Sequence, residues 1–132
     1  ITLIICLIFY CGMAYAAARQ VLFSGSINHN TIVGTVAVYL LLGLLWALMY
    51  LITLEYWPGG INGIDVRHWN DNLGSAIYFS FITMTSTGYG DITPALPVTR
   101  TLAYLQAITG TFYMAVVVAS LVSAFSRAAK QS

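Results

Sequence analysis

The residues best suited to chemistry stand side by side at positions 86–91, which read STGYGD. A cation that sheds its water needs several oxygen ligands, and identical segments around one axis can supply them as rings of backbone carbonyls. Gly88 and Gly90 permit the backbone angles that aim successive carbonyls the same way, because glycine has no Cβ to clash. Ser86 adds a ring of hydroxyls, and Tyr89 can point outward and brace the segment against neighbouring aromatic side chains. The stretch therefore predicts a backbone site for a dehydrated cation.

A short apolar segment, residues 73–85, comes immediately before this site and is too short to cross a bilayer as a helix. Asn70, Asp71 and Asn72 precede it and favour a helix start, so we expect a half-length helix there. Backbone that is not helical at membrane depth must line protein or water, because lipid cannot satisfy its polar groups. The C-terminal end of the helix carries partial negative charge, which favours a cation. A Gly-Tyr-Gly tripeptide alone would indicate only a turn, but this setting indicates a pore.

The composition predicts that these elements lie in a membrane. Of the 132 residues, 59% are hydrophobic and 7% are charged, against about 25% charged in soluble domains. Uncharged runs at residues 1–18, 31–54 and 101–126 can each cross a hydrocarbon core of about 30 Å. The first run lacks the pattern of a signal peptide, so we expect a helix that is retained. Since the chain begins within apolar sequence, we also expect a fragment, with further helices or a cytoplasmic regulatory domain outside it.

The distribution of charge predicts an orientation. Arg19, Arg127 and Lys130 flank the long runs without a neighbouring acid, whereas all four acidic residues lie between the second and third runs. The positive-inside rule then places the basic flanks and the C-terminus in the cytoplasm and residues 86–91 on the outer side. We expect the membrane to be the plasma membrane. Among the other residues, Cys6 fits apolar packing, and no pattern predicts an enzyme, a cofactor or a nucleic-acid partner.

Residues 78–94, YFSFITMTSTGYGDITP, resemble the pore region of potassium channels, most closely the voltage-gated type, in which Thr-Met-Thr precedes the filter. The resemblance covers residues 32–126 and includes Glu55, at the end of the outer helix, as a support of the filter. It implies an all-α membrane protein with outer helix, re-entrant pore helix, selectivity filter and inner helix, assembled as a homotetramer that conducts K⁺ through the lipid bilayer. The filter segment is then residues 86–90, and the resemblance implies K⁺ binding at Ser86, Thr87, Gly88 and Tyr89.

This chain departs from the family's usual Thr-Val-Gly-Tyr-Gly filter at two positions, which leaves the degree of K⁺ over Na⁺ selectivity open. Ser86 keeps the hydroxyl but lacks a methyl group, and Thr87 replaces a valine of nearly the same shape and adds a hydroxyl behind the filter. Ile82 stands where some bacterial relatives carry a glutamate that pairs with the filter aspartate. Tyr78 is therefore the expected partner of Asp91.

The third apolar run is the expected inner helix, with Pro97 in its first turn. Gly110 lies about 20 Å further along the axis and resembles the family's gating hinge, although close helix packing explains a small residue equally well. By the resemblance, one face of this helix lines a water-filled cavity and continues to a gate. The residues on that face are Thr111, Met114, Ala115, Val118, Val122 and Phe125.

Residues 1–31 fall outside the resemblance, and we expect a peripheral transmembrane helix and a cytoplasmic linker there, before a pore domain over residues 32–132. A voltage sensor needs several arginines within the membrane, and Arg19 stands alone. Three other functions remain open at this stage: a weakly selective or non-selective cation channel, a subunit of a potassium-uptake transporter, and a membrane protein that conducts nothing.

Overall fold

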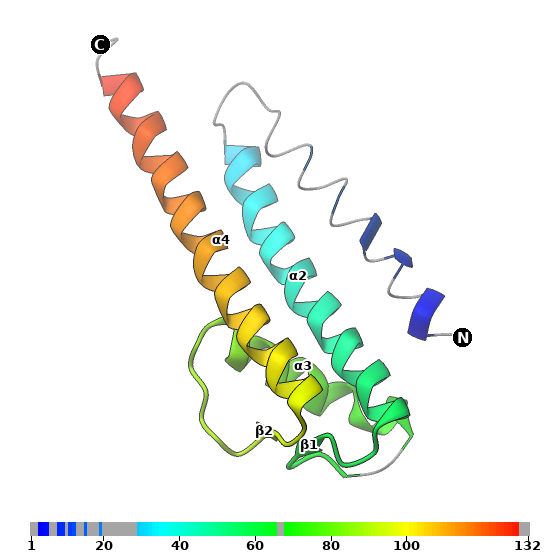
Figure 1. Ribbon diagram of the computed structural model, residues 1–132. Coiled ribbons are helices and arrows are strands. Elements are labelled where there is room, and N and C mark those ends of the chain that lie inside the picture. Colours follow the sequence, from blue (N-terminus) through cyan, green and yellow to red (C-terminus); the bar gives the residue numbers. More distant parts are fainter. Residues whose placement is uncertain are drawn as a thin grey trace.

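Three long helices dominate the part of the chain that the structure describes. The computed structural model describes residues 3–5, 8–9, 11–12, 15, 19, 29–65 and 68–129. Helix α2 spans His29–Tyr56, α3 spans Trp69–Met84 and α4 spans Pro97–Ala129, with short strands β1 (Ile61–Asn62) and β2 (Thr93–Pro94) between them (Figure 1). Helices α2 and α4 run antiparallel, so that α2 begins near the end where α4 finishes.

Helices α2 and α4 are long and apolar enough to cross a membrane. The candidate spans are Ile32–Tyr56, with 25 residues, and Pro97–Ser123, with 27 residues. In the most apolar part of each span, only 22% and 11% of the residues are buried by the rest of the chain. Such uncovered apolar surface is suited to lipid or to further copies of the chain. The predicted inner helix is confirmed to start at Pro97.

Helix α3 is the predicted half-length helix, but it begins four residues earlier than residue 73. His68 is its N-cap and accepts the backbone N–H of Asn70 through Nδ1 at 3.5 Å. The prediction that Asn70, Asp71 and Asn72 precede the helix is therefore wrong, because all three lie in its first turn. The Asn72 side chain instead donates to the backbone carbonyl of Asp65 at 2.9 Å and so fixes the loop before the helix.

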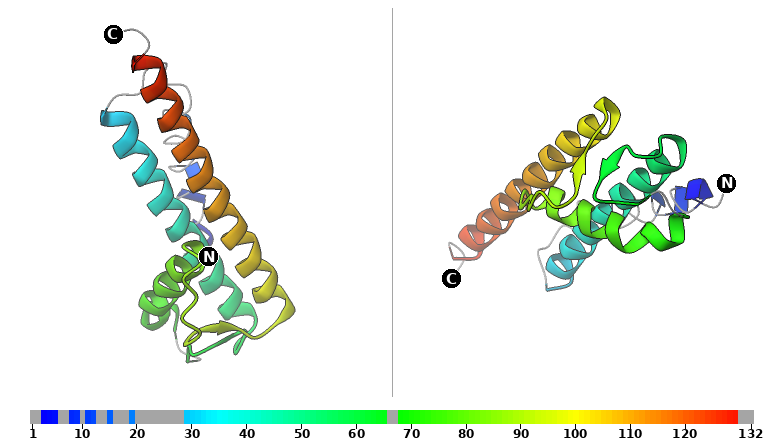
Figure 2. Two further views of the ribbon diagram at one scale, coloured as in Figure 1. Left: turned by 90° about the vertical axis from the view of Figure 1, so that its left-hand side faces the viewer. Right: turned by 90° about the horizontal axis from the view of Figure 1, so that it is seen from below.

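Helix α3 packs across the ends of α2 and α4 that lie away from the C-terminus (Figure 2). Two clusters of buried side chains form this junction. The ring of Tyr50 lies 4.8 Å from that of Phe79 in one cluster, centroid to centroid. Leu3 contributes to the other cluster, beside α2 and α3. The junction holds the C-terminal end of α3 in place, and this end leads into the filter segment.

Strands β1 and β2 join the loops on either side of α3. They pair antiparallel, with Ile61 opposite Pro94 and Asn62 opposite Thr93. Gly63, at φ 84°, lies against the backbone carbonyl of Asp91, where a Cβ would come within 2.5 Å of that oxygen. The loop after α2 is thereby attached to the backbone that follows the filter segment.

The predicted peripheral helix falls mostly on residues outside the described part of the chain. The few described residues between positions 3 and 19 are helical, and Leu3 is buried against α2 and α3. The prediction of a transmembrane helix and linker over residues 1–31 is not tested by this structure.

Candidate functional site

The backbone of the filter segment is attached to the C-terminal end of α3. The N–H groups of Thr87 and Gly88 donate to the carbonyl of Ile82 at 2.9 and 3.2 Å, and the N–H of Ser86 donates to Thr83 at 3.0 Å. No described peptide bond is cis, and in a trans peptide the carbonyl points opposite to the N–H that follows it. The carbonyls of Thr85, Ser86 and Thr87 therefore point away from α3.

Backbone angles in the left-handed region accompany this arrangement. Gly88 has φ 50° and Gly90 has φ 87°, as their lack of a Cβ allows. Ser86 has φ 57°, and it is the one non-glycine residue of the described chain with a positive φ. A residue with a Cβ in this region is strained by about 1–2 kcal/mol. The strain at Ser86, which the sequence does not predict, falls at the inner end of the predicted cation site.

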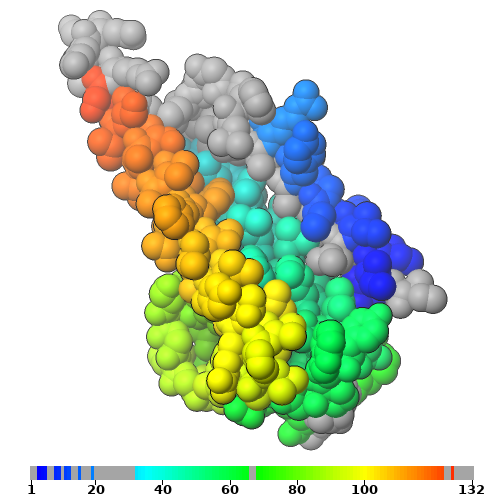
Figure 3. All heavy atoms as spheres, viewed as in Figure 1, coloured from blue at the N-terminus to red at the C-terminus, as the bar shows by residue number. Residues whose placement is uncertain are grey.

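The filter segment is uncovered by the rest of the chain. All five of its residues are exposed, and Tyr89 retains 74% of its surface. In the space-filling view the segment, in yellow-green, stands out along one side of α4 (Figure 3). Within residues 29–65 and 68–129 no aromatic ring pairs with Tyr89, and the aromatic brace around it stays a prediction.

The added hydroxyl of Thr87 lies behind the filter segment. Its Oγ1 is 2.8 Å from Oγ1 of Thr85, which donates its single hydrogen to the carbonyl of Phe81 at 2.7 Å. Thr87 must therefore be the donor to Thr85. The Thr87 hydroxyl is thus bonded to the end of α3.

Tyr78 and Asp91 lie together, as the sequence predicts for a filter support. The pKa of Tyr78 is raised from its ordinary value of 10.0, first by a side-chain hydrogen bond to Asp91 and further by partial desolvation and the negative charge of Asp91. The neutral Tyr78 hydroxyl is the donor in this pair. Ile82, the third residue of that prediction, is buried in the core. The functional effect of the pair stays a prediction.

Glu55 lies at the end of α2, as predicted, and its side chain is exposed. Within residues 29–65 and 68–129 it has no hydrogen bond or ion pair with the filter segment. The role of Glu55 as a filter support therefore stays a prediction. It requires a partner other than the contacts that the described residues make. In the same described residues, no three His, Cys, Asp or Glu side chains gather to hold a metal ion.

Gly110 is packed directly against the entrance to the filter segment. A Cβ on this residue would overlap the carbonyl oxygen of Met84 and lie 2.9 Å from Met84 Cγ. Helix α4 continues unbroken through Gly110. Of the two explanations that the sequence leaves open, this geometry supports close packing, and the hinge stays a prediction.

The predicted cavity face of α4 is turned away from the other two long helices. Thr111, Met114, Ala115, Val118 and Val122 are all exposed, whereas Gln106 and Gly110 are buried against α2 and α3. The two faces differ by roughly one residue step, or about 100°, around the helix. The side chain of Phe125 lies outside the described part of the structure, so its place at a gate is untested.

Sequence reasoning misses a buried polar group beside the site. Tyr50, Ser80 and Gln106 come from α2, α3 and α4, and each has 0% relative exposure. One signal was available, since Gln106 interrupts an otherwise apolar run, and a polar residue in such a run usually faces the interior of a helix bundle. Its partners, however, are far away in the sequence.

Comparison with known families identifies the class. The family model described as "Ion channel" matches residues 31–127. The chain therefore belongs to the ion channel family, and its three described helices form the predicted all-α fold of a membrane channel. This family conducts ions passively across membranes and is not a class of enzymes. No curated protein matches the chain closely enough to add to this assignment.

Proposed function

We propose that this chain is the pore subunit of a potassium-selective channel. The observation that carries the proposal is the direction of the backbone in the filter segment. Because the N–H groups of Ser86, Thr87 and Gly88 bond to the end of α3, the carbonyls before them point away from α3, and the filter segment is exposed in the single chain. Rows of carbonyls that face an axis can replace the water around K⁺.

We propose a homotetramer as the conducting unit. A single filter segment offers an ion only one carbonyl in each layer, whereas full coordination takes about six to eight oxygens. Four copies around one axis supply that number from adjacent layers. The exposure of the filter segment and of the Thr111–Val122 face of α4 supports this assembly, because both surfaces would then face the axis or a neighbouring copy.

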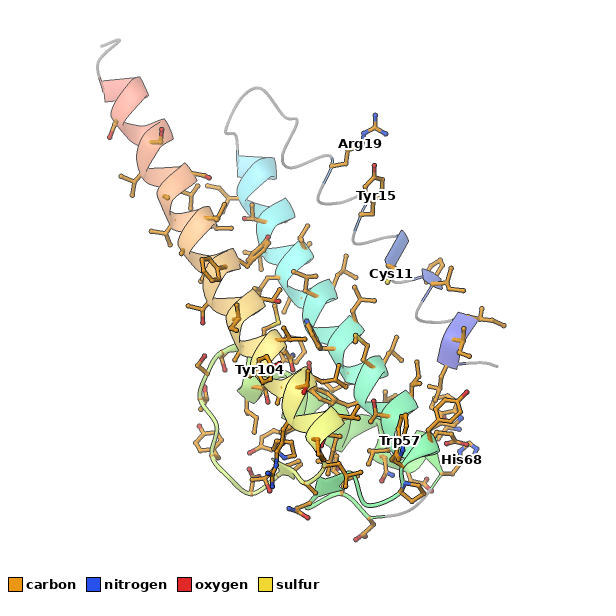
Figure 4. All side chains as sticks on the ribbon, viewed as in Figure 1. Cys11, Tyr15, Arg19, Trp57, His68 and Tyr104 are labelled. Atoms are coloured by element: carbon orange, nitrogen blue, oxygen red, sulfur yellow. The ribbon has the colours of Figure 1, made fainter. Side chains whose placement is uncertain are left out.

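In this proposal the filter segment faces the outside of the plasma membrane. It lies at one end of the molecule, and the labelled side chain of Arg19 lies toward the other end, near the start of α2 (Figure 4). Helix α4 also carries its C-terminal residues to that end. Placing the basic flanks in the cytoplasm accords with the positive-inside rule.

Reversal potential tests the selectivity. The purified protein is placed in a planar bilayer with K⁺ on one side largely replaced by Na⁺ on the other. A potassium-selective pore shifts the reversal potential by about 59 mV per tenfold K⁺ gradient. A reversal potential near zero would instead identify a non-selective cation channel, and K⁺ uptake without channel current would identify a transporter subunit.

Two alanine variants distinguish an effect on the filter segment from the effect of backbone strain elsewhere in the chain. Gly90 and Gly59 have φ of +87° and +81°, and a Cβ at either position would meet no atom within 4 Å. Both variants therefore suffer similar backbone strain, but only Gly90 lies in the filter segment. We expect Gly90→Ala to lose K⁺ selectivity or conductance and Gly59→Ala to retain both. Equal loss in the two variants would contradict the proposed role of the segment.

A further inference from the structure

A set of buried hydrogen bonds ties the three long helices together beside the filter segment. The Tyr50 hydroxyl donates to Oε1 of Gln106 at 2.7 Å. Nε2 of Gln106 donates to the backbone oxygen of Ser80 at 2.9 Å and to its Oγ at 2.7 Å. The Ser80 hydroxyl donates to the carbonyl of Gly43 at 2.6 Å. We call these four residues the three-helix clasp.

The direction of every bond in the clasp follows from one acceptor. The Gly43 carbonyl can only accept, so the single hydroxyl hydrogen of Ser80 goes there and Ser80 Oγ must accept from Gln106. Gln106 must therefore turn its NH₂ group toward Ser80 and its oxygen toward Tyr50. A flipped amide would place oxygen against the Ser80 carbonyl, so that two acceptors would face each other. The clasp thus fits a glutamine in one orientation.

The three-helix clasp holds α3 close to the residues that attach the filter segment to this helix. Ser80 lies two residues before Ile82, whose carbonyl accepts the N–H groups of the filter segment. It also lies two residues after Tyr78, which interacts with Asp91. Tyr78 and Ile82 each lie within one helical turn of Ser80. A shift or rotation of α3 at Ser80 therefore displaces both the bonds at Ile82 and the Tyr78–Asp91 pair.

We propose that Gln106 is a positioning residue for the ion pathway. Its amide fixes the height and rotation of α3 against α4, and this keeps the filter segment in its conducting geometry although Gln106 itself is buried away from the ion. The inference rests on the function proposed above. A purely structural role would instead stabilise the whole helix bundle without a particular effect on the filter segment.

The variant Gln106→Glu tests the amide with almost no change in size. A neutral carboxylic acid can still donate one hydrogen bond to Ser80 and accept one from Tyr50, whereas a carboxylate can donate none. We therefore expect an effect that grows as the pH rises. The measurements are single-channel open time and hydrogen exchange of the backbone amides at residues 86–88. We expect both to change by about tenfold or more, since a buried polar group loses its partner.

Two further variants keep the test decisive if Gln106→Glu fails to assemble. Tyr50→Phe removes one hydroxyl of the clasp and little volume. Thr109→Val is the control, because within residues 29–65 and 68–129 the Thr109 hydroxyl bonds only to the carbonyl of Leu105 in its own helix, at 2.8 Å. We expect Tyr50→Phe to speed exchange at residues 86–88 more than in α2, and Thr109→Val to match the wild type.

Two results would overturn the proposal. One is wild-type open time and filter exchange in both clasp variants at every pH. The other is an equal rise of exchange throughout α2, α4 and the filter segment, which indicates general loosening. The exchange measurement does not depend on which ion passes, so failure of the clasp is distinguished from failure of potassium selectivity, which the wild-type reversal potential measures.

Discussion

Replacement of Gly110 with alanine tests how α4 meets the entrance to the filter segment. The new Cβ would lie 2.9 Å from Met84 Cγ and 3.1 Å from the Met84 carbonyl carbon. Carbon atoms in contact rest at about 3.5–4.0 Å, and the new Cβ would also overlap the Met84 carbonyl oxygen, so α3 and α4 must separate by about an ångström. Overpacking destabilises the folded state by about 1–3 kcal/mol. The higher helix propensity of alanine offsets about 1 kcal/mol of this loss. The expected net destabilisation is up to about 2 kcal/mol per subunit.

Denaturant unfolding of the purified protein measures this loss, and bilayer recording measures its effect on conduction. We expect Gly110→Ala to lower the free energy of unfolding and to alter selectivity or open time, because Met84 leads directly into the filter segment. Gly74→Ala is the matched control on α3, since a Cβ there would meet no atom within 4 Å. That variant should be neutral or more stable by up to about 1 kcal/mol.

A hinge at Gly110 would give the opposite result. Gly110→Ala would then keep the stability and selectivity of the wild type and lower only the open probability. A glycine restored one position away, in Thr109→Gly combined with Gly110→Ala, would recover the open probability by returning flexibility to α4. That pair of results would refute the packing explanation.

Three further predictions concern the surroundings of the filter segment. Tyr78→Phe removes the donor to Asp91 and should speed inactivation or change its extent; recordings identical to the wild type would show that the pair is unimportant. Because the folded state raises the pKa of Tyr78 above 10.0, its contribution to stability should be complete below pH 10 and lost as pH rises through the raised pKa. This alkaline loss should be absent from the unfolding profile of Tyr78→Phe. Thr87→Val keeps the shape but loses the bond to Thr85, and should lower stability by about 1 kcal/mol in thermal unfolding.

The half-length helix could be predicted because its signals are local. Residues 73–85 are apolar, too short to span a membrane and followed by glycines. The first turn was not predictable in the same way, because the His68 side chain supplies the cap and Asn72 bonds backward to Asp65. Strands of two residues, such as Ile61–Asn62, carry no periodic pattern at all. Their pairing depends on the packing that brings the C-terminal end of α2 close to the N-terminal end of α4.

The candidate site was predictable in its residues but not in its packing. The positive φ of Gly88 and Gly90 follows from residue type, whereas that of Ser86 belongs to the end of α3, where the N–H groups of Ser86 and Thr87 bond back to Thr83 and Ile82. Gln106 is visible in the sequence as a polar residue in an apolar run. Its bond to Ser80, however, joins residues 26 positions apart and exists only once α3 and α4 are packed together.

The most direct test of a fourfold potassium pore is to locate ions in the assembled protein. A structure of the purified channel with K⁺ exchanged for Rb⁺, which scatters anomalously, would identify both the symmetry and the ion positions. We expect four chains around one axis, with Rb⁺ on that axis between the levels of Ser86 and Tyr89 and within reach of the backbone carbonyls. An assembly without fourfold symmetry, or a filter segment whose carbonyls turn away from the axis and hold no ion, would contradict it.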